Sequence, residues 1–279
     1  MNRFSNVLCA VAIDERDRLV FAHALALARR HGAKLLLLHA ASPQVAFNRG
    51  ATERVAFLGR LRSLGEAAGI DIRVAVQTGP VDEIILLHAR ARQVDLIVIG
   101  TSRTAARRGL SGWIAERVLR DAPCPTLVVP EAAKAPTWFP DSVLCAVDFS
   151  PASHSAVQEA VRMSNHGNRR VTLLHVVDGS GTAARSKELD KLRYLIPPRD
   201  RAVVLALVAV GRPVPEILRA VRAINAELLV IGATPRTRVG SRLFGETGQI
   251  LRDARCPVLA VPALTGARAE GDGAGKIAA

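Results

Sequence analysis

Two arginine-rich loops are the places where this sequence could bind an anion. Each follows an apolar run that ends in glycine, DLIVIG in one case and ELLVIG in the other. The arginines are Arg103, Arg107 and Arg108 in the first loop, and Arg236, Arg238 and Arg242 in the second. Arginine binds phosphate through paired, charge-assisted hydrogen bonds, so either cluster could hold a phosphorylated ligand. Solvated loop residues would explain the same pattern, and both interpretations stay open.

A carboxylate stands at a third position of interest. Asp148 directly follows the apolar run VLCAV and precedes Ser150. It could contact a ligand, or it could shape the turn into the following helix, for which Ser150 is the better N-cap.

The residue patterns of common catalytic and metal sites are missing from the sequence. No P-loop lysine, loop carboxylate pair or nucleophile–histidine pair is present. The four cysteines form no C-x-x-C pair, which argues against zinc. His39 and His175 each end an LLH run without a catalytic partner, and we expect them to be structural. We therefore expect no enzymatic activity and no metal.

The chain contains an internal repeat. Cys9 in NVLCAVAI matches Cys145 in SVLCAVDF at an offset of 136 residues. Cys124 in RDAPCPTLVVP matches Cys256 in RDARCPVLAVP at an offset of 132 residues. Two constant offsets indicate one duplication, with a net loss of four residues in the second copy. We expect domains at residues 1–132 and 141–264, followed by a disordered tail at 265–279.

Each copy alternates apolar runs with segments of helical period. The strands expected in the first copy are Val7–Ala12, Lys34–Ala40, Ile72–Val76, Leu96–Ile99 and Thr126–Val129. The helices expected between them are Asp17–Arg30, Thr52–Ala67, Pro80–Ala91 and Trp113–Arg120, with Val55, Leu58, Leu61 and Leu64 as the buried stripe of the second. This alternation predicts an α/β fold with two tandem, doubly wound, parallel five-stranded sheets, both faces covered by helices.

Several motifs resemble the universal stress protein family. They are VLCAVDFSPASHSAV, V-x-x-G-x-P-x-x-x-I, DLIVIG and AERVLRDAPCPTLVVP, and the likeness covers nearly the whole chain. The resemblance implies a Rossmann-like fold of the adenine nucleotide alpha hydrolase type, with the last strands Thr126–Val129 and Val258–Val261 paired within the chain. It also implies ATP or another adenine nucleotide bound in the second copy. The residues that it assigns to that site are Asp148, Val176, Gly232, Thr234, Arg236, Gly245 and Thr247.

Both copies depart from the family's phosphate loop, patterned G-x2-G-x9-G-[ST]. In the second copy Pro235 replaces the second glycine, which removes a backbone donor, and Glu246 occupies the hydroxyl position. In the first copy Ala12 stands where the second has Asp148, and Trp113 follows the last loop glycine. We therefore expect nucleotide in at most one copy. The alternative is a stress-induced interaction scaffold that binds no nucleotide.

Composition narrows the partners. The 38 Lys and Arg residues outnumber the 25 Asp and Glu residues, for a formal net charge of +13. Such a charge suits a polyanion, but aromatic residues are only 4% of the chain, so no platform for stacking bases is evident. No signal peptide or membrane-spanning run is present in the sequence. We expect a cytoplasmic protein whose two copies form an intramolecular pseudo-dimer, with a homo-oligomer as a further option and nucleic acid or membrane as disfavoured partners.

Overall fold

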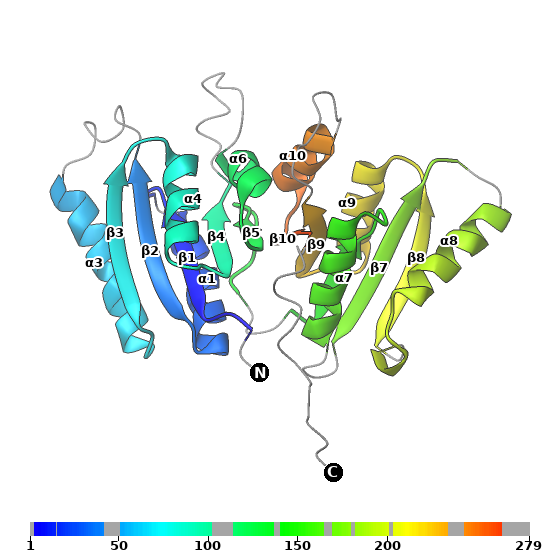
Figure 1. Cartoon of the computed structure of the whole chain (residues 1–279), viewed down its shortest axis with the longest axis horizontal. Helices are drawn as coiled ribbons and strands as arrows, with labels where there is room; N and C mark the ends of the chain where they lie inside the picture. Colours follow the sequence, from blue (N-terminus) through cyan, green and yellow to red (C-terminus); the bar gives the residue numbers. More distant parts are fainter. Residues whose placement is uncertain are drawn as a thin grey trace, which may run out of the picture.

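The structure is a computed structural model that describes residues 3–14, 16–41, 51–101, 114–136, 140–164, 169–179, 182–200, 203–233 and 243–263. Figure 1 shows two α/β halves side by side, with their strands forming one sheet through the middle of the molecule. The first half runs from β1 to β5 and the second from β6 to β10.

The elements of the first half follow the strand–helix alternation expected from the sequence. They are β1 (Asn6–Val11), α1 (Asp17–His31), β2 (Lys34–Ala41), α3 (Ala51–Ala67), β3 (Ile72–Thr78), α4 (Val81–Ala91), β4 (Leu96–Gly100), α6 (Ile114–Asp121) and β5 (Thr126–Val129). Each strand and helix predicted for this half is confirmed to within two residues at its ends.

The second half repeats this order with a shorter helix after its second strand. Its elements are β6 (Ser142–Ala146), α7 (Pro151–Ser164), β7 (Arg170–Val177), α8 (Thr182–Tyr194), the 3₁₀ turn η1 (Pro198–Asp200), β8 (Val204–Val210), α9 (Pro213–Ala223), β9 (Leu228–Ala233), α10 (Leu243–Asp253) and β10 (Val258–Pro262). The four-residue deletion falls on α8, which has 13 residues where α3 has 17.

The sheet is doubly wound within each half. Its strand order is β3-β2-β1-β4-β5-β10-β9-β6-β7-β8, and all pairs inside one half are parallel. The chain therefore winds outward from β1 to β3 and then crosses to β4 and β5, on the far side of β1. This reversal leaves a switch point between β1 and β4, and another between β6 and β9.

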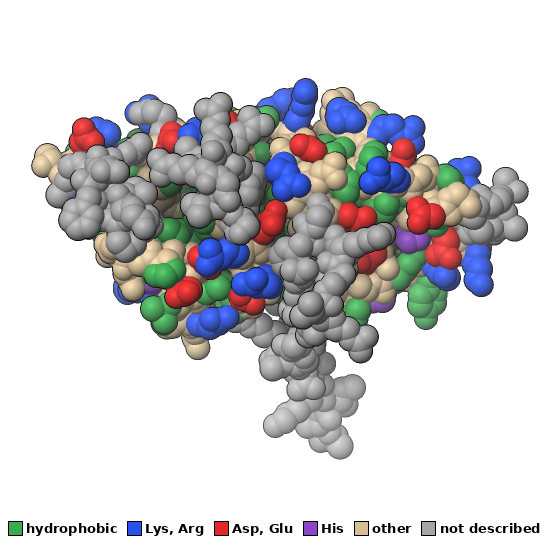
Figure 2. Space-filling view, turned by 90° about the horizontal axis from the view of Figure 1, so that it is seen from above, with side chains coloured by type: hydrophobic (Ala, Val, Ile, Leu, Met, Phe, Trp, Pro, Cys, Tyr) green, Lys and Arg blue, Asp and Glu red, His purple; other side chains and the backbone are tan. Residues whose placement is uncertain are grey.

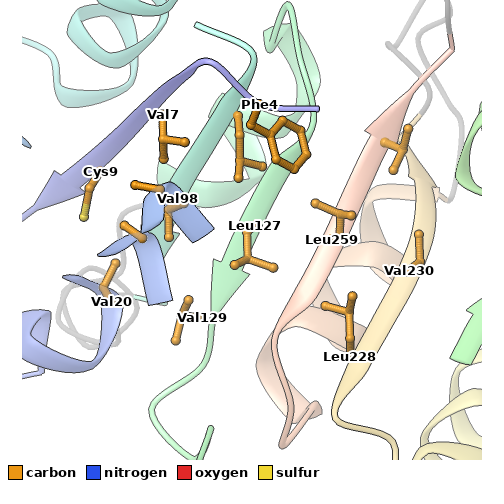
Figure 3. Close-up of a cluster of buried hydrophobic side chains, with 14 of the residues drawn as sticks. Phe4, Val7, Cys9, Val20, Val98, Leu127, Val129, Leu228, Val230 and Leu259 are labelled. Carbon is orange, nitrogen blue, oxygen red and sulfur yellow. The ribbon is translucent and has the colours of Figure 1, made fainter. Parts of the chain in front are cut away.

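The two halves join edge to edge through their last strands. β5 and β10 pair antiparallel, with Leu127 opposite Leu259. The expected pairing of the last strands is thus confirmed, and the two five-stranded sheets form one sheet of ten strands. Figure 3 shows Leu127 and Leu259 on these neighbouring strands, inside a cluster of buried apolar side chains.

The core is two apolar layers, one on each face of the sheet, and both layers cross the junction. One contains Leu127 and Leu259, and the other contains Val128 and Val258. Because apolar surface is buried continuously from one half to the other, the junction resembles the interior of a single domain. An ion pair between Arg3, before β1, and the buried Glu159 on α7 adds a second link between the halves.

Two sequence expectations about burial are wrong, both at the outer edges. Val55 and Leu64 were expected in the buried stripe of α3, but their side chains are 71% and 58% exposed, and the buried residues are Phe57, Leu58 and Leu61. Likewise β3 and β8 expose apolar side chains, including Leu205, which is 55% exposed. An outermost strand has a neighbour on one side only, so its covering helix overhangs into solvent and buries a narrower stripe.

The repeated Cys-Pro dipeptides mark the start of the last strand in each half. Cys124 and Cys256 are buried, and β5 and β10 start directly after Pro125 and Pro257. The proline carbonyls accept hydrogen bonds from the N–H groups of Ile97 and Leu229 in the neighbouring strands, at 3.0 Å each. A strand-start proline loses no ladder bond, because only its carbonyl is needed there.

Candidate functional site

The switch point of the second half gathers several of the residues singled out in the sequence. Asp148 follows the carboxyl end of β6, Gly232 lies at the carboxyl end of β9, and Val176 lies near the end of β7. These three strands are neighbours, since β6 pairs with β9 on one side and with β7 on the other. The fold therefore brings these positions to one edge of the sheet, where open α/β sheets bind ligands.

Asp148 and Ser150 build the turn between β6 and α7. The N–H of Ser150 donates to Oδ1 of Asp148 at 2.9 Å, and the N–H of Ser153 donates to Oγ of Ser150 at 3.2 Å. Ser150 is thus the N-cap of α7, as expected. Burial favours a higher pKa for Asp148, but hydrogen bonds from Ser150 and Ser153 outweigh it and hold the pKa below its ordinary value. The exposed carboxylate is therefore charged at neutral pH.

Gly232 is required by packing. A Cβ built on it would lie 2.6 Å from the backbone N of Ser153 and 2.7 Å from the backbone C of Ala152. The first turn of α7 consequently rests directly on the end of β9. A glycine at this position is explained by helix–strand contact, whether or not a ligand approaches it.

The remaining candidates are only partly placed. Thr247 is half-buried and is the fifth residue of α10, so its N–H lies beyond the four free donors of the first turn and only its hydroxyl can serve a ligand. Gly245 is the third residue of α10. Thr234 and Arg236 lie outside the described residues, as do the other arginines of both loops. Val176 is half-buried and packs against the apolar layer that contains Val214.

A cluster beside the candidate site was not anticipated from the sequence. The ring centroid of Phe149, which has a left-handed φ of 60°, lies 4.6 Å from that of His175. Nδ1 of His175 donates to the carbonyl of Val147 at 2.7 Å. Nζ of Lys191 lies 5.6 Å from the centroid of Phe149 and donates to Glu188 at 2.8 Å. Lys191 therefore adds a cation near the end of β6, which its place in a charged helix did not reveal.

Comparison with known proteins identifies the family. A model of the universal stress protein family matches residues 3–130 and 140–262, which is most of the chain and one match per half. The chain belongs to the universal stress protein family. A universal stress protein of Mycobacterium tuberculosis is 27% identical over 217 residues, which cover 70% of this chain and 71% of that protein.

Other members resemble this universal stress protein over different lengths. One from Methanocaldococcus jannaschii is 38% identical over 79 residues, which cover 28% of this chain and 46% of that protein. The crystal structure of a universal stress protein from Archaeoglobus fulgidus has the same fold, with a TM-score of 0.68 and 20% identity over 92% of this chain and 96% of that one. The tandem architecture is thus shared with a solved member of the family.

The first half of this universal stress protein keeps the frame of the site but not its acid. Ala12 stands where the second half has Asp148, and Ile13 repeats the left-handed backbone of Phe149, with a φ of 64°. Nδ1 of His39 donates to the carbonyl of Val11 at 2.9 Å, as His175 does to Val147. Both histidines therefore secure the end of the strand next to them, as the sequence predicted.

The helix start of the first half uses a buried carboxylate instead of a serine. Oδ2 of Asp17, the first residue of α1, accepts the N–H of Asp14 at 2.7 Å. Asp17 is buried, and burial raises its pKa to about 6, with the nearby charge of Asp14 acting in the same direction and backbone hydrogen bonds opposing it. At neutral pH the charged form of Asp17 therefore lowers the free energy of unfolding.

We predict that Asp17→Asn raises stability at pH 7.5, by at most about 3 kcal/mol. The folded pKa lies above the unfolded value of 3.8, so the folded chain holds this proton more tightly. The stability that Asp17 gains by protonation is complete below pH 3.8 and is lost as the pH rises through 6. Urea unfolding at several pH values should therefore show a gap between variant and wild type that closes toward pH 4.

The matched control is Asp121→Asn, because Asp121 is an exposed carboxylate on α6. It should show no comparable gap at pH 7.5. An Asp17→Asn protein that is no more stable than wild type at pH 7.5, or a gap that does not shrink in acid, would contradict the prediction.

Among the described residues, no group of three or more His, Cys, Asp and Glu side chains could hold a metal ion. The four cysteines are buried thiols, and burial raises the pKa of Cys256 to about 11. No helix in the described ranges is long and apolar enough to span a membrane.

Figure 2 looks onto the carboxyl edge of the sheet, where described Lys and Arg side chains are interspersed with Asp and Glu.

Proposed function

We propose that the second half binds one adenine nucleotide, such as ATP, at the switch point between β6 and β9. The observation that carries this proposal is the charged, exposed carboxylate of Asp148 at that edge of the sheet. A carboxylate only accepts hydrogen bonds, so Asp148 suits the hydroxyl or amine donors of a nucleoside and not its phosphates. The phosphates would lie toward the segment between β9 and α10.

Arginine is proposed to replace the lost features of the phosphate loop. Pro235 has no N–H to donate, and Glu246 would repel a phosphate. Arg236, Arg238 and Arg242 lie in the same segment of sequence and could supply bidentate, charged donors. Lys191, near the end of β6, adds a further positive charge on that side.

The first half is proposed to bind no nucleotide. It has Ala12 in place of the acid, and the start of its α1 is occupied by the Asp14–Asp17 hydrogen bond and by the ion pair of Asp14 with Arg16 at 2.8 Å. The expected stoichiometry is therefore one nucleotide per chain.

Isothermal titration of the full chain with ATP tests the proposal. Asp148→Asn keeps an acceptor for Ser150 and removes only the charge, and we predict about tenfold weaker binding or more, as for the loss of a charged hydrogen bond. Replacing Arg236, Arg238 and Arg242 together by alanine in the wild-type chain should weaken ATP binding more than Asp148→Asn does. The matched control replaces Arg103, Arg107 and Arg108 of the first half and should leave the affinity unchanged. No saturable binding at millimolar ATP, or two sites per chain, would contradict the proposal.

A second candidate function is an interaction scaffold that binds no nucleotide. The contact between Gly232 and α7 favours it, because this contact accounts for the glycine without any ligand. Titrations without heat or saturation, together with nucleotide-free protein after purification, would support the scaffold and exclude the first proposal.

A further inference from the structure

The junction of the two halves is built on an approximate twofold axis. Leu127 and Leu259 occupy equivalent positions in the repeat, 132 residues apart, and they face each other in the antiparallel pair. On one side of this pair, α6 of the first half contacts α10 of the second. An axis of this kind sets each residue near it against its own equivalent.

The equivalent residues Glu116 and Gly248 are such a pair, and they differ. A Cβ built on Gly248 would overlap Oε1 of Glu116 and would lie 2.9 Å from its Cδ. The Glu116 side chain is only 16% exposed and lies 3.5 Å from the guanidinium of Arg252, measured from Oε1 to Nη1. The carboxylate of one half therefore occupies the space that the glycine of the other half leaves open.

We propose that Glu116 and Gly248 form an asymmetric key that makes each half complementary to the other and not to itself. Two first halves meeting in this way would place two carboxylates in a space that holds one. Two second halves would set glycine against glycine and leave each Arg252 without the carboxylate. Two first halves would supply an arginine for each carboxylate, Arg120 being the equivalent of Arg252, but they would overfill the space. Only the cross-pairing fills the space once and gives its carboxylate an arginine partner.

Burial around Glu116 agrees with this arrangement. Burial raises the pKa of its carboxyl group, and the charge of Arg252 opposes the rise. A second carboxylate at position 248 would add a like charge at close range in a partly desolvated place, which is unfavourable, and Arg120 would offset only part of this repulsion.

The key also touches the candidate site, a consequence that rests on the proposed function. Gly248 directly follows Thr247, so Glu116 packs against the part of α10 that carries the candidate hydroxyl. The first half would then position a helix of the binding half although it binds no nucleotide itself.

Three full-length variants, compared with wild type, test the key with thermal unfolding as the readout. Gly248→Glu reproduces the pairing of two first halves, and Glu116→Gly reproduces that of two second halves, with the linker unchanged. We predict that each single variant lowers Tm by about 5 °C or more. The double variant Glu116→Gly/Gly248→Glu has the same composition as wild type and should recover most of the loss.

Two arginines show which half carries the carboxylate. By the twofold relation, the carboxylate that the double variant carries at position 248 would face Arg120, the equivalent of Arg252. Arg252→Ala should therefore lower Tm in the wild-type chain but not in the double variant, and Arg120→Ala should do the reverse. Gly59→Glu on α3 is the control for a new glutamate in a helix, because no atom of the described residues, apart from the adjacent residues and the backbone of α3 itself, lies within 4 Å of a Cβ at Gly59.

A double variant that is no more stable than the worse single variant would overturn the key. So would an unchanged Tm for Gly248→Glu. Because unfolding is measured without nucleotide, these outcomes do not depend on whether ATP binds.

Discussion

Replacement of Gly232 by alanine is expected to lower the free energy of unfolding by about 3 kcal/mol or more. The added methyl group would lie 2.6 Å from the backbone N of Ser153 and 2.7 Å from the backbone C of Ala152. Neither backbone atom can rotate away, so α7 must move off the sheet or β9 must bend. Urea unfolding of the purified variant measures the loss.

The repeat offers a matched control at Gly100, the equivalent end of β4. A Cβ there would lie 2.9 Å from Cγ2 of Val20, which belongs to a side chain. Gly100→Ala should therefore cost only about 1 kcal/mol, since the valine can shift. Equal losses at the two glycines would show that the contact with α7 is not what requires Gly232.

This result bears on how the nucleotide motif is interpreted. If Gly232→Ala unfolds or displaces α7, loss of ATP binding in that variant would say nothing about a contact between glycine and phosphate. The charge variant Asp148→Asn and the arginine triple variants are free of this ambiguity. Asparagine at position 148 still accepts the hydrogen bond from Ser150 that holds the turn, and the arginines lie in the segments that connect β4 to α6 and β9 to α10.

The second large effect is expected at the ion pair between Arg3 and Glu159. The Glu159 side chain is only 2% exposed, and Arg3 is its partner from the other half. Arg3→Ala leaves a buried carboxylate without this partner, which typically costs about 3 kcal/mol or more. Chemical denaturation at pH 7.5 measures the loss.

The pH dependence separates a charge effect from lost packing. Burial raises the pKa of Glu159, and Arg3 opposes the rise, so removing Arg3 should raise the pKa further. A raised folded pKa means that stability increases as the pH falls, because the folded chain then takes up the proton. The difference between Arg3→Ala and wild type should therefore shrink in acid.

A double variant completes this test. Arg3→Ala/Glu159→Gln removes both charges and should recover much of the stability lost in Arg3→Ala. A loss that is the same at every pH and is not recovered by the second substitution would show that Arg3 acts through packing alone.

Much of the fold could be predicted because its signals are local. The apolar runs, the helical periods and the prolines each act over a few residues. Because the domain is duplicated, each of these patterns occurs twice in the sequence and one copy supports the other. The burial of α3 was misjudged because periodicity shows which residues share a helix face, whereas exposure depends on how much of the sheet lies beneath. The helix beside an edge strand overhangs, and so Val55 and Leu64 remain in solvent.

Only part of the candidate site could be predicted from the sequence. Asp148 and Gly232 stood out by their places after strands, and the structure brings them to one edge of the sheet. The sequence could not show that Gly232 is held against α7, because the contact joins residues about 80 positions apart. Phe149 and Lys191 were missed for the same reason, since their approach depends on how α8 lies over the sheet.

The sequence by itself determined the duplication, the order of the strands and helices, and the loss of the acid from one copy. These properties depend on residue type and spacing along the chain. Only the tertiary structure decided which residues of one half meet the other, namely Arg3 with Glu159 and Glu116 with Gly248. The twofold axis that brings equivalent positions together arises from the antiparallel pairing of β5 with β10. Because of this axis, the glutamate at position 116 and the glycine at position 248 lie in contact although they are far apart in the sequence.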